Sequence, residues 1–219
     1  MIFCTDREYK ETKLIKKGVK FIPEPFHELA DWITDNREVK VINIVYDCIM
    51  PPNRPRLQII LEYERDHQLF KNDRGNYLKS EQDAIRKKFI EIVQRDKLGT
   101  FSYENLLVIF SAFEPVAIDE AHSKVSDYEI EKLRKKLKNN DLWKIRPSLG
   151  CVTFFFFTED QVKYYEIMGV KKSFTKEYIE IIKVHDEFGY LNENNLSVKI
   201  DSKENFDKAY NSNWFYYDR

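Results

Sequence analysis

Cysteine and glycine are both scarce in this chain of 219 residues. The three cysteines, Cys4, Cys48 and Cys151, are odd in number and far apart, so neither a disulfide framework nor a paired-cysteine metal site is indicated. They are typical of free thiols in a reducing compartment, and we predict a cytoplasmic protein. Only six glycines and seven prolines are present, which excludes collagen-like chains and chains dominated by flexible linkers.

Long hydrophobic runs are also absent. The longest uncharged apolar segments, 106–113 and 151–157, are far shorter than the roughly 20 residues that a membrane-spanning helix needs. The N-terminus becomes charged at Asp6, before an apolar stretch of signal-peptide length has formed. The sequence therefore predicts no membrane partner.

Neither sign of charge dominates, because 36 lysines and arginines face 37 aspartates and glutamates. The resulting formal charge of −1 gives little overall attraction to nucleic acid. One basic segment, 126–138, begins with a capping box from Ser126 to Glu129 and is predicted to form a helix. Glu129 and Glu131 interrupt its lysines and arginines, as is typical of a solvated face. A nucleic-acid-binding module is therefore only our second alternative.

Sequence signatures of common catalytic sites are missing. The chain has no G-x-x-x-x-G-K-[ST], G-x-G-x-x-G, G-x-S-x-G or H-E-x-x-H motif and no paired C-x-x-C. Its scattered glycines do not form a loop that could bring backbone amides onto a phosphate. We predict no cofactor and no metal, and we favour a protein that is not an enzyme.

Apolar patterning nevertheless predicts a packed globule, since hydrophobic residues make up 42% of the chain and aromatic residues 15%. Strand-like patterns at 39–46 and 57–63, joined by a proline-rich loop, predict an antiparallel hairpin. Segments 106–113 and 151–157 are apolar on both faces, as in central strands, and 196–200 alternates as an edge strand does. Helical periodicity accounts for most of the remaining segments.

The predicted class is α+β, as a single globular domain over 1–219 with a mixed, mainly antiparallel sheet of about five strands and about six helices. The first 20 residues show little periodicity, and we expect a loosely attached arm at 1–20. No low-complexity linker marks a domain boundary, and any weak seam is expected near 139–147. No internal repeat of fixed period is evident in the sequence.

The best enzyme candidate is a set of carboxylates on the predicted first hairpin, formed by Asp47, Glu62 and Glu64. Such oxygens could converge on Mg²⁺, because hard cations bind several oxygen ligands. The arrangement resembles the hairpin of restriction-endonuclease-like nucleases, in which an aspartate is followed by an (Asp/Glu)-x-Lys motif. Asp47 and Glu62 match that pattern, whereas Glu64 occupies the place of the lysine. The resemblance implies our first alternative, a nuclease or hydrolase that depends on a divalent metal.

Two histidines have acidic neighbours in the sequence. His122 follows Asp119 and Glu120, but a single histidine in such a segment is typical of a surface or capping residue. His185 precedes an acidic pair, yet it shares the apolar helix stripe of Tyr178 and Ile182, and we interpret it as a hydrogen-bonded core histidine. Neither histidine is predicted to be catalytic.

The C-terminal third combines acidic and aromatic residues. Residues 151–219 hold nine basic and twelve acidic residues, and 16 of the 32 aromatic residues of the chain. Four consecutive rings, at 214–217, would point alternately to opposite sides of an extended segment, so that one side could contact a partner. We predict a partner-binding surface formed by Glu187, Asp207, Tyr210, Trp214, Tyr216 and Asp218.

Acidic residues around exposed rings would attract a basic protein and raise its association rate. We therefore expect a non-catalytic module that binds a basic protein partner. In class and charge the chain is similar to bacterial immunity proteins and antitoxins, which cover the cationic active sites of toxic enzymes. The resemblance implies an antagonist role and includes no shared motif.

Overall fold

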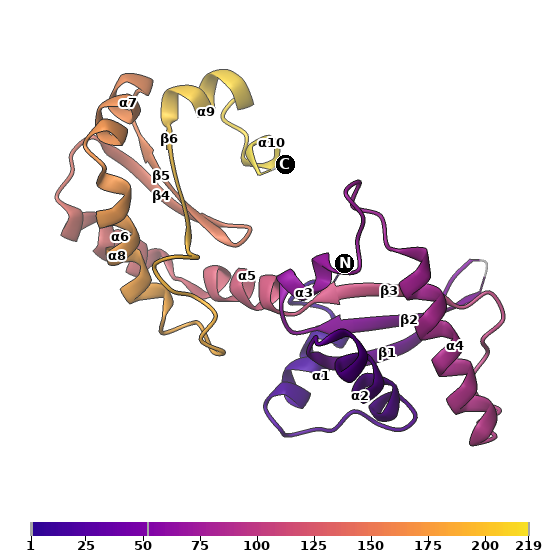
Figure 1. Cartoon of the computed structure of the whole chain (residues 1–219). Helices are drawn as coiled ribbons and strands as arrows, with labels where there is room; N and C mark the ends of the chain where they lie inside the picture. Colours follow the sequence, from indigo (N-terminus) through magenta and orange to yellow (C-terminus); the bar gives the residue numbers. More distant parts are fainter. Residues whose placement is uncertain (1, 52, 219) are drawn as a thin grey trace. The chain divides into compact units, whose positions relative to one another are not determined.

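The computed structural model describes residues 2–51 and 53–218 and divides the chain into two compact units, Met1–Pro115 and Val116–Arg219 (Figure 1). Within the described ranges the chain forms six strands, in two three-stranded sheets, and ten helices. The α+β class is therefore confirmed. The two units are described separately below.

The first unit contains the sheet β1-β2-β3, in which β2 is the central strand. Strand β2 runs antiparallel to β1 and parallel to β3. The elements in chain order are α1 (Arg7–Lys16), α2 (Phe26–Arg37), β1 (Val41–Ile49), β2 (Arg54–Leu61), α3 (Glu64–Gln68), α4 (Lys79–Arg95) and β3 (Leu107–Ala112). Helix α5 (Glu114–Lys124) then begins at the boundary with the second unit.

The second unit contains the sheet β4-β5-β6, with β5 at its centre, antiparallel to β4 and parallel to β6. The elements that follow α5 are α6 (Asp127–Leu137), β4 (Leu142–Ser148), β5 (Cys151–Phe156), α7 (Glu159–Ile167), α8 (Val170–Ile182), β6 (Ser197–Ser202), α9 (Lys203–Tyr210) and α10 (Trp214–Tyr217). Strands β4 and β5 are joined by Leu149 and Gly150, both at positive φ (47° and 71°). Two consecutive positive φ angles form the hairpin turn that matches the twist of antiparallel strands, and Gly150 adopts this conformation without steric cost.

The two units repeat one order of elements. In each, two helices precede an antiparallel hairpin, two further helices follow it, and a third strand then pairs parallel to the second. The first strand of each hairpin has a shift in register at its start, between Val41 and Asn43 in β1 and between Leu142 and Lys144 in β4. The corresponding connections differ in length, since β1 and β2 are joined by 50–53 and β4 and β5 by 149–150.

Individual hydrogen bonds repeat as well. Beyond the third strand, Glu114 accepts a hydrogen bond from the backbone N–H of Glu64, the first residue of α3 (3.0 Å). In the second unit Glu204 accepts from the N–H of Glu159, the first residue of α7 (3.1 Å). A carboxylate suits both places, because the first turn of a helix has unpaired N–H donors and a partial positive charge. The repeat therefore extends from topology to single contacts.

Each central strand is buried on both faces. Leu57, Ile59, Ile60 and Leu61 of β2 have no exposed surface. Burial on both faces follows from the central position of the strand. In β5 the three consecutive rings Phe154, Phe155 and Phe156 are fully buried as well. Phe154 stacks on Phe174 of α8 (4.5 Å between ring centroids), whereas Phe155 packs edge-on against Trp214 (5.4 Å).

Several predicted details differ from the structure. The strands lie in two sheets, and each sheet has one antiparallel and one parallel pair, so the predicted mainly antiparallel sheet is wrong. Strand β3 is an edge strand, although its apolar sequence predicted a central one. The division between units falls after Pro115, whereas the interval 139–147 contains most of β4. The expected arm at 1–20 contains α1, whose Tyr9 is buried and stacks on Phe113 (5.0 Å).

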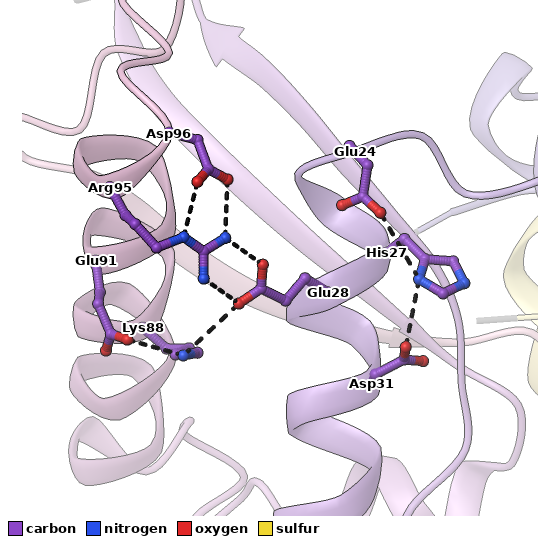
Figure 2. A network of polar contacts seen from close by, with 8 residues as sticks. All are labelled: Glu24, His27, Glu28, Asp31, Lys88, Glu91, Arg95 and Asp96. Carbon is purple, nitrogen blue, oxygen red and sulfur yellow. Dashed lines mark hydrogen bonds and ion pairs between the residues drawn. The ribbon is translucent and has the colours of Figure 1, made fainter.

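A network of ion pairs joins α2 to α4 on the surface of the first unit (Figure 2). Arg95 binds both carboxylate oxygens of Glu28 (2.9 and 2.5 Å) and also binds the neighbouring Asp96. Lys88 lies between Glu28 (3.9 Å) and Glu91 (3.0 Å). The hydrogen bond from Arg95 lowers the pKa of Glu28 and that of Asp96. Because these charges are partly exposed and paired with one another, the network serves helix packing and offers no reactive group.

The predicted capping box at Ser126 is present, and a second capping box begins α7. The Ser126 hydroxyl accepts from the N–H of Glu129, whose carboxylate accepts from the N–H of Ser126, and Thr158 and Gln161 do the same at α7. The Ser126 contacts and His185 lower the pKa of Glu129 to about 2. The sequence therefore located the start of α6 correctly.

We predict that Ser126→Ala destabilises the start of α6 by about 1 kcal/mol, the usual cost of removing a hydroxyl cap. Amide hydrogen exchange at Glu129 measures this, because its N–H loses its acceptor. Ser126→Thr, which retains a hydroxyl, is the matched control and should exchange nearly as slowly as the parent protein. Equal protection in the alanine variant would contradict the role of the cap.

Candidate functional site

The three carboxylates of the first hairpin do not form a common site. In the register of the hairpin, Asp47 lies opposite Arg56. Glu62 directly follows Leu61, which pairs with Val41, six positions before Asp47 in β1. Each carboxylate has partners of its own: Asp47 binds Arg56 (2.8 Å), and Glu64 contacts His67 (3.2 Å). Among the described residues, no group of three or more His, Cys, Asp or Glu side chains could hold a metal ion. The geometry therefore does not support the predicted convergence on Mg²⁺.

Glu62 is instead a buried structural anion. Its side chain is only 4% exposed and forms ion pairs with Lys16 of α1 and with Lys40. Burial alone would raise its pKa, but the hydrogen bonds from Lys16 and Lys40 hold the pKa of this carboxyl below its ordinary value. Glu62 thus ties α1 and the start of β1 to the end of β2. Lys16 lies in the segment 1–20, for which an arm was expected. Its positive charge was the sequence feature that could have indicated this contact.

The C-terminal ring segment is a single helical turn, α10, and not an extended strand. Positions 214 and 217 share one side of this turn, and both rings pack inward. Trp214 stacks on Phe206 (3.9 Å) and Tyr217 contacts Phe155 (5.2 Å). Phe215 and Tyr216 lie on the other side and are 62% and 51% exposed. Two of the four rings therefore pack against the core, and the other two face solvent.

The helical turn changes which rings face solvent. An extended segment would place Trp214 and Tyr216 on the same side, whereas the helix pairs Phe215 with Tyr216 (5.6 Å between centroids). Phe215 was not among the predicted surface residues for this reason. Asn213 held the missing signal, because its side chain accepts from the N–H of Phe215 and caps α10.

Most of the predicted acidic surface is matched within the chain. Asp207 binds Lys203 and the Ser212 hydroxyl, and the Lys203 contact lowers the pKa of Asp207. Asp218 binds Arg146 and accepts from Ser148 (3.1 Å). Tyr210 is half-buried against Tyr217 (4.9 Å), whereas Glu187 is exposed. Because the aspartates are neutralised by their own unit, they add little field toward a basic partner.

The basic helix α6 also neutralises part of its charge. Arg134 binds Glu131 (3.1 Å), and Lys136 binds Glu177 of α8. Glu129, at the start of the helix, accepts from Nε2 of His185 (2.9 Å). His185 is therefore a half-buried, hydrogen-bonded histidine that lies just beyond the end of α8. These pairs give α6 the mixed charge of a solvated face rather than a continuous basic stripe.

His122 differs from its predicted surface role. It lies near the end of α5, is only 2% exposed, and its Nδ1 is 3.0 Å from the hydroxyl of the fully buried Tyr178. Burial lowers the pKa of His122 to about 4, so the ring is neutral at pH 7. The alanines around His122 in the sequence were the signal that α5 turns an apolar side toward the core.

No helix in the described part of the chain is both long and apolar enough to cross a membrane. This agrees with the short apolar runs of the sequence.

We predict that Glu62→Gln lowers the free energy of unfolding of the first unit at pH 7 by about 3 kcal/mol, because it leaves the largely buried Lys16 without its anion. The folded pKa of Glu62 is lowered, so its contribution is complete above the ordinary value of 4.5 and is lost as pH falls through the folded pKa. The deficit of the variant should therefore shrink at acidic pH. Denaturation between neutral and acidic pH measures it.

Glu64→Gln is the matched control for this experiment, because the same atom is changed in a side chain that is 42% exposed. Its effect should stay within about 0.5 kcal/mol. A deficit in Glu62→Gln that is as small as in the control would contradict the structural role of Glu62.

Comparison with protein-family models, with curated proteins and with solved structures gave no match for this chain.

Proposed function

We propose that the protein is a non-catalytic protein-binding module that contacts its partner through Phe215 and Tyr216 of α10. The observation that carries this proposal is the exposure of the two rings, 62% and 51%, in a turn whose other two rings are anchored in the core. Aromatic residues supply a large contact area at low conformational cost and are enriched in binding hot spots. Trp214 and Tyr217 fix the turn, so the exposed rings keep a defined position on the surface.

The residues before α10 suit the rim of such an interface. Asn211, Ser212 and Asn213 are exposed and polar, and Asn211 and Ser212 hold positive φ angles (51° and 55°). A polar rim around an apolar centre is the usual anatomy of a protein–protein interface. Two rings cover only part of the roughly 800 Å² that each partner buries in a standard complex, so further residues of the second unit would take part.

We still propose a basic partner, but recognition would depend on the aromatic rings instead of on the acidic residues. The aspartates near α10 are already matched, so recognition would depend on rings that accept arginine or lysine side chains over their faces. The most specific form of this function is an immunity-like or antitoxin-like antagonist that covers a basic surface of a toxic protein. The hairpin carboxylates lie apart and provide no comparable support for a metal-dependent nuclease.

We predict that the double variant Phe215→Ala/Tyr216→Ala weakens binding of the purified partner at least about 30-fold, because each hot-spot ring contributes about 1–2 kcal/mol. The partner is first identified by affinity capture with the full chain, and its dissociation constant is then measured for parent and variant. Circular dichroism should show an unchanged fold, since both rings lie outside the core.

Ile167→Ala is the matched control, because Ile167 is an apolar residue 86% exposed at the end of α7. Binding should be unchanged in this variant. If the double variant binds as tightly as the parent protein, or if Ile167→Ala causes the larger loss, α10 is not the contact surface.

A further inference from the structure

The end of α7 exposes three apolar side chains in one patch. Tyr164, Ile167 and Met168 are 57%, 86% and 61% exposed. Because these positions are three and four residues apart, their side chains lie on one side of the helix. The other side of α7 packs through Val162 and Tyr165 against the core of the second unit. A cluster of exposed apolar residues indicates a contact surface, and this one takes no part in the function proposed above.

The residues that follow this patch are basic. Lys171 and Lys172 lie in the first turn of α8, and Lys176 lies one turn beyond Lys172 on the same side. All three side chains are exposed, and none of them forms an ion pair within the described part of the chain. Between positions 164 and 176 these three lysines are accompanied by one carboxylate, Glu166, so the segment has a formal charge of +2. We call the three apolar residues and the three lysines together the α7–α8 surface.

The place of the lysines is unfavourable for α8 itself. The N-terminal end of a helix carries a partial positive charge, which favours acidic residues in the first turn and disfavours lysine. Helices α6 and α7 follow this rule, but the first turn of α8 has no acidic residue, and its N-cap Gly169 provides no side-chain hydrogen bond. Lys171 and Lys172 therefore do not stabilise α8. A negatively charged partner outside the chain would give them a role.

The composition of the α7–α8 surface separates three classes of negatively charged partner. Lysine is depleted in interfaces between proteins. The backbone of a nucleic acid offers phosphates, but no apolar surface for Ile167 and Met168. At a membrane surface, aliphatic side chains enter the boundary between headgroups and acyl chains, tyrosine lies among the headgroups, and lysine attracts anionic lipids. The combination of residues therefore favours a lipid surface.

We propose that the α7–α8 surface binds a bilayer that contains anionic lipids. Ile167 and Met168 enter the headgroup region, while Lys171, Lys172 and Lys176 contact the negatively charged headgroups. The absence of a membrane partner was predicted from the lack of a spanning segment, and binding at the surface requires none. Because exposed charges supply part of the attraction, salt should weaken the contact.

The test mixes the full-length protein with vesicles of phosphatidylcholine alone or with about one third phosphatidylserine, an anionic lipid. Sedimentation of the vesicles separates bound from free protein. We expect the protein to sediment with the anionic vesicles at low salt, to be released as salt rises, and to stay in solution with phosphatidylcholine alone. Protein that stays in solution with both, or that binds both equally, would overturn the proposal.

A short DNA duplex and polyglutamate, each offered in place of the vesicles, test the other two classes of partner. Neither should bind as tightly as the anionic vesicles. If either binds more tightly than the vesicles do, the lysines serve a nucleic acid or an acidic protein, and the proposal is wrong.

Lys171→Gln/Lys172→Gln should weaken binding to the anionic vesicles about 25-fold, because each lysine near such a bilayer contributes about fivefold. Thermal stability should not fall, since both lysines oppose the helix dipole. Lys79→Gln/Lys87→Gln is the matched control, because it removes the same charge from two exposed positions of α4 in the first unit. An equal loss in the control would overturn the proposal, since only net charge would then matter.

Ile167→Ala/Met168→Ala should weaken the same binding at least about tenfold, because it removes most of the apolar surface that enters the bilayer. Val184→Ala is the matched control, since Val184 is an apolar residue that is 80% exposed beyond the other end of α8. Its binding should equal that of the parent protein. Unchanged binding of the double variant would show that the apolar patch takes no part, and would overturn the proposal.

Discussion

The fold depends on one constraint that both units share: the central strand of each sheet must be covered on both faces. The residues of β2 and β5 are almost entirely buried, so helices have to pack on each side of a sheet only three strands wide. A parallel third strand meets this need, because a connection between parallel strands must cross over the sheet and brings helices with it. The element order of the units follows from this burial.

Sequence patterns predicted local structure well where side-chain chemistry acts over a few residues. The hairpin, the capping boxes at Ser126 and Thr158, and the double burial of Phe154–Phe156 all follow from short-range rules. Strand β4 was missed because Lys144, Arg146 and Pro147 interrupt its apolar residues. The first hairpin could be predicted together with its pairing, whereas the parallel pairing of β3 with β2 and of β6 with β5 could not.

The candidate site was predicted less well, because its features depend on contacts between distant residues. The pairing of Asp218 with Arg146 joins positions 72 residues apart, and no local pattern indicates that this acid is neutralised. The same holds for Glu62, whose partner Lys16 lies in a segment that showed no periodicity. In α10 the error was geometric, since a single turn of helix exposes neighbours that a strand would separate.

The repeated order of elements allows corresponding positions to be compared across the units. The N–H of Glu62 donates to the carbonyl of Lys40, and at the same place in the second unit the N–H of Phe157 donates to the carbonyl of Asp141. The first position thus holds a buried acid, Glu62, and the second holds a partly exposed ring, Phe157. A backbone contact that tolerates both side chains allows the two units to share one order of elements while they present different side chains at the same place.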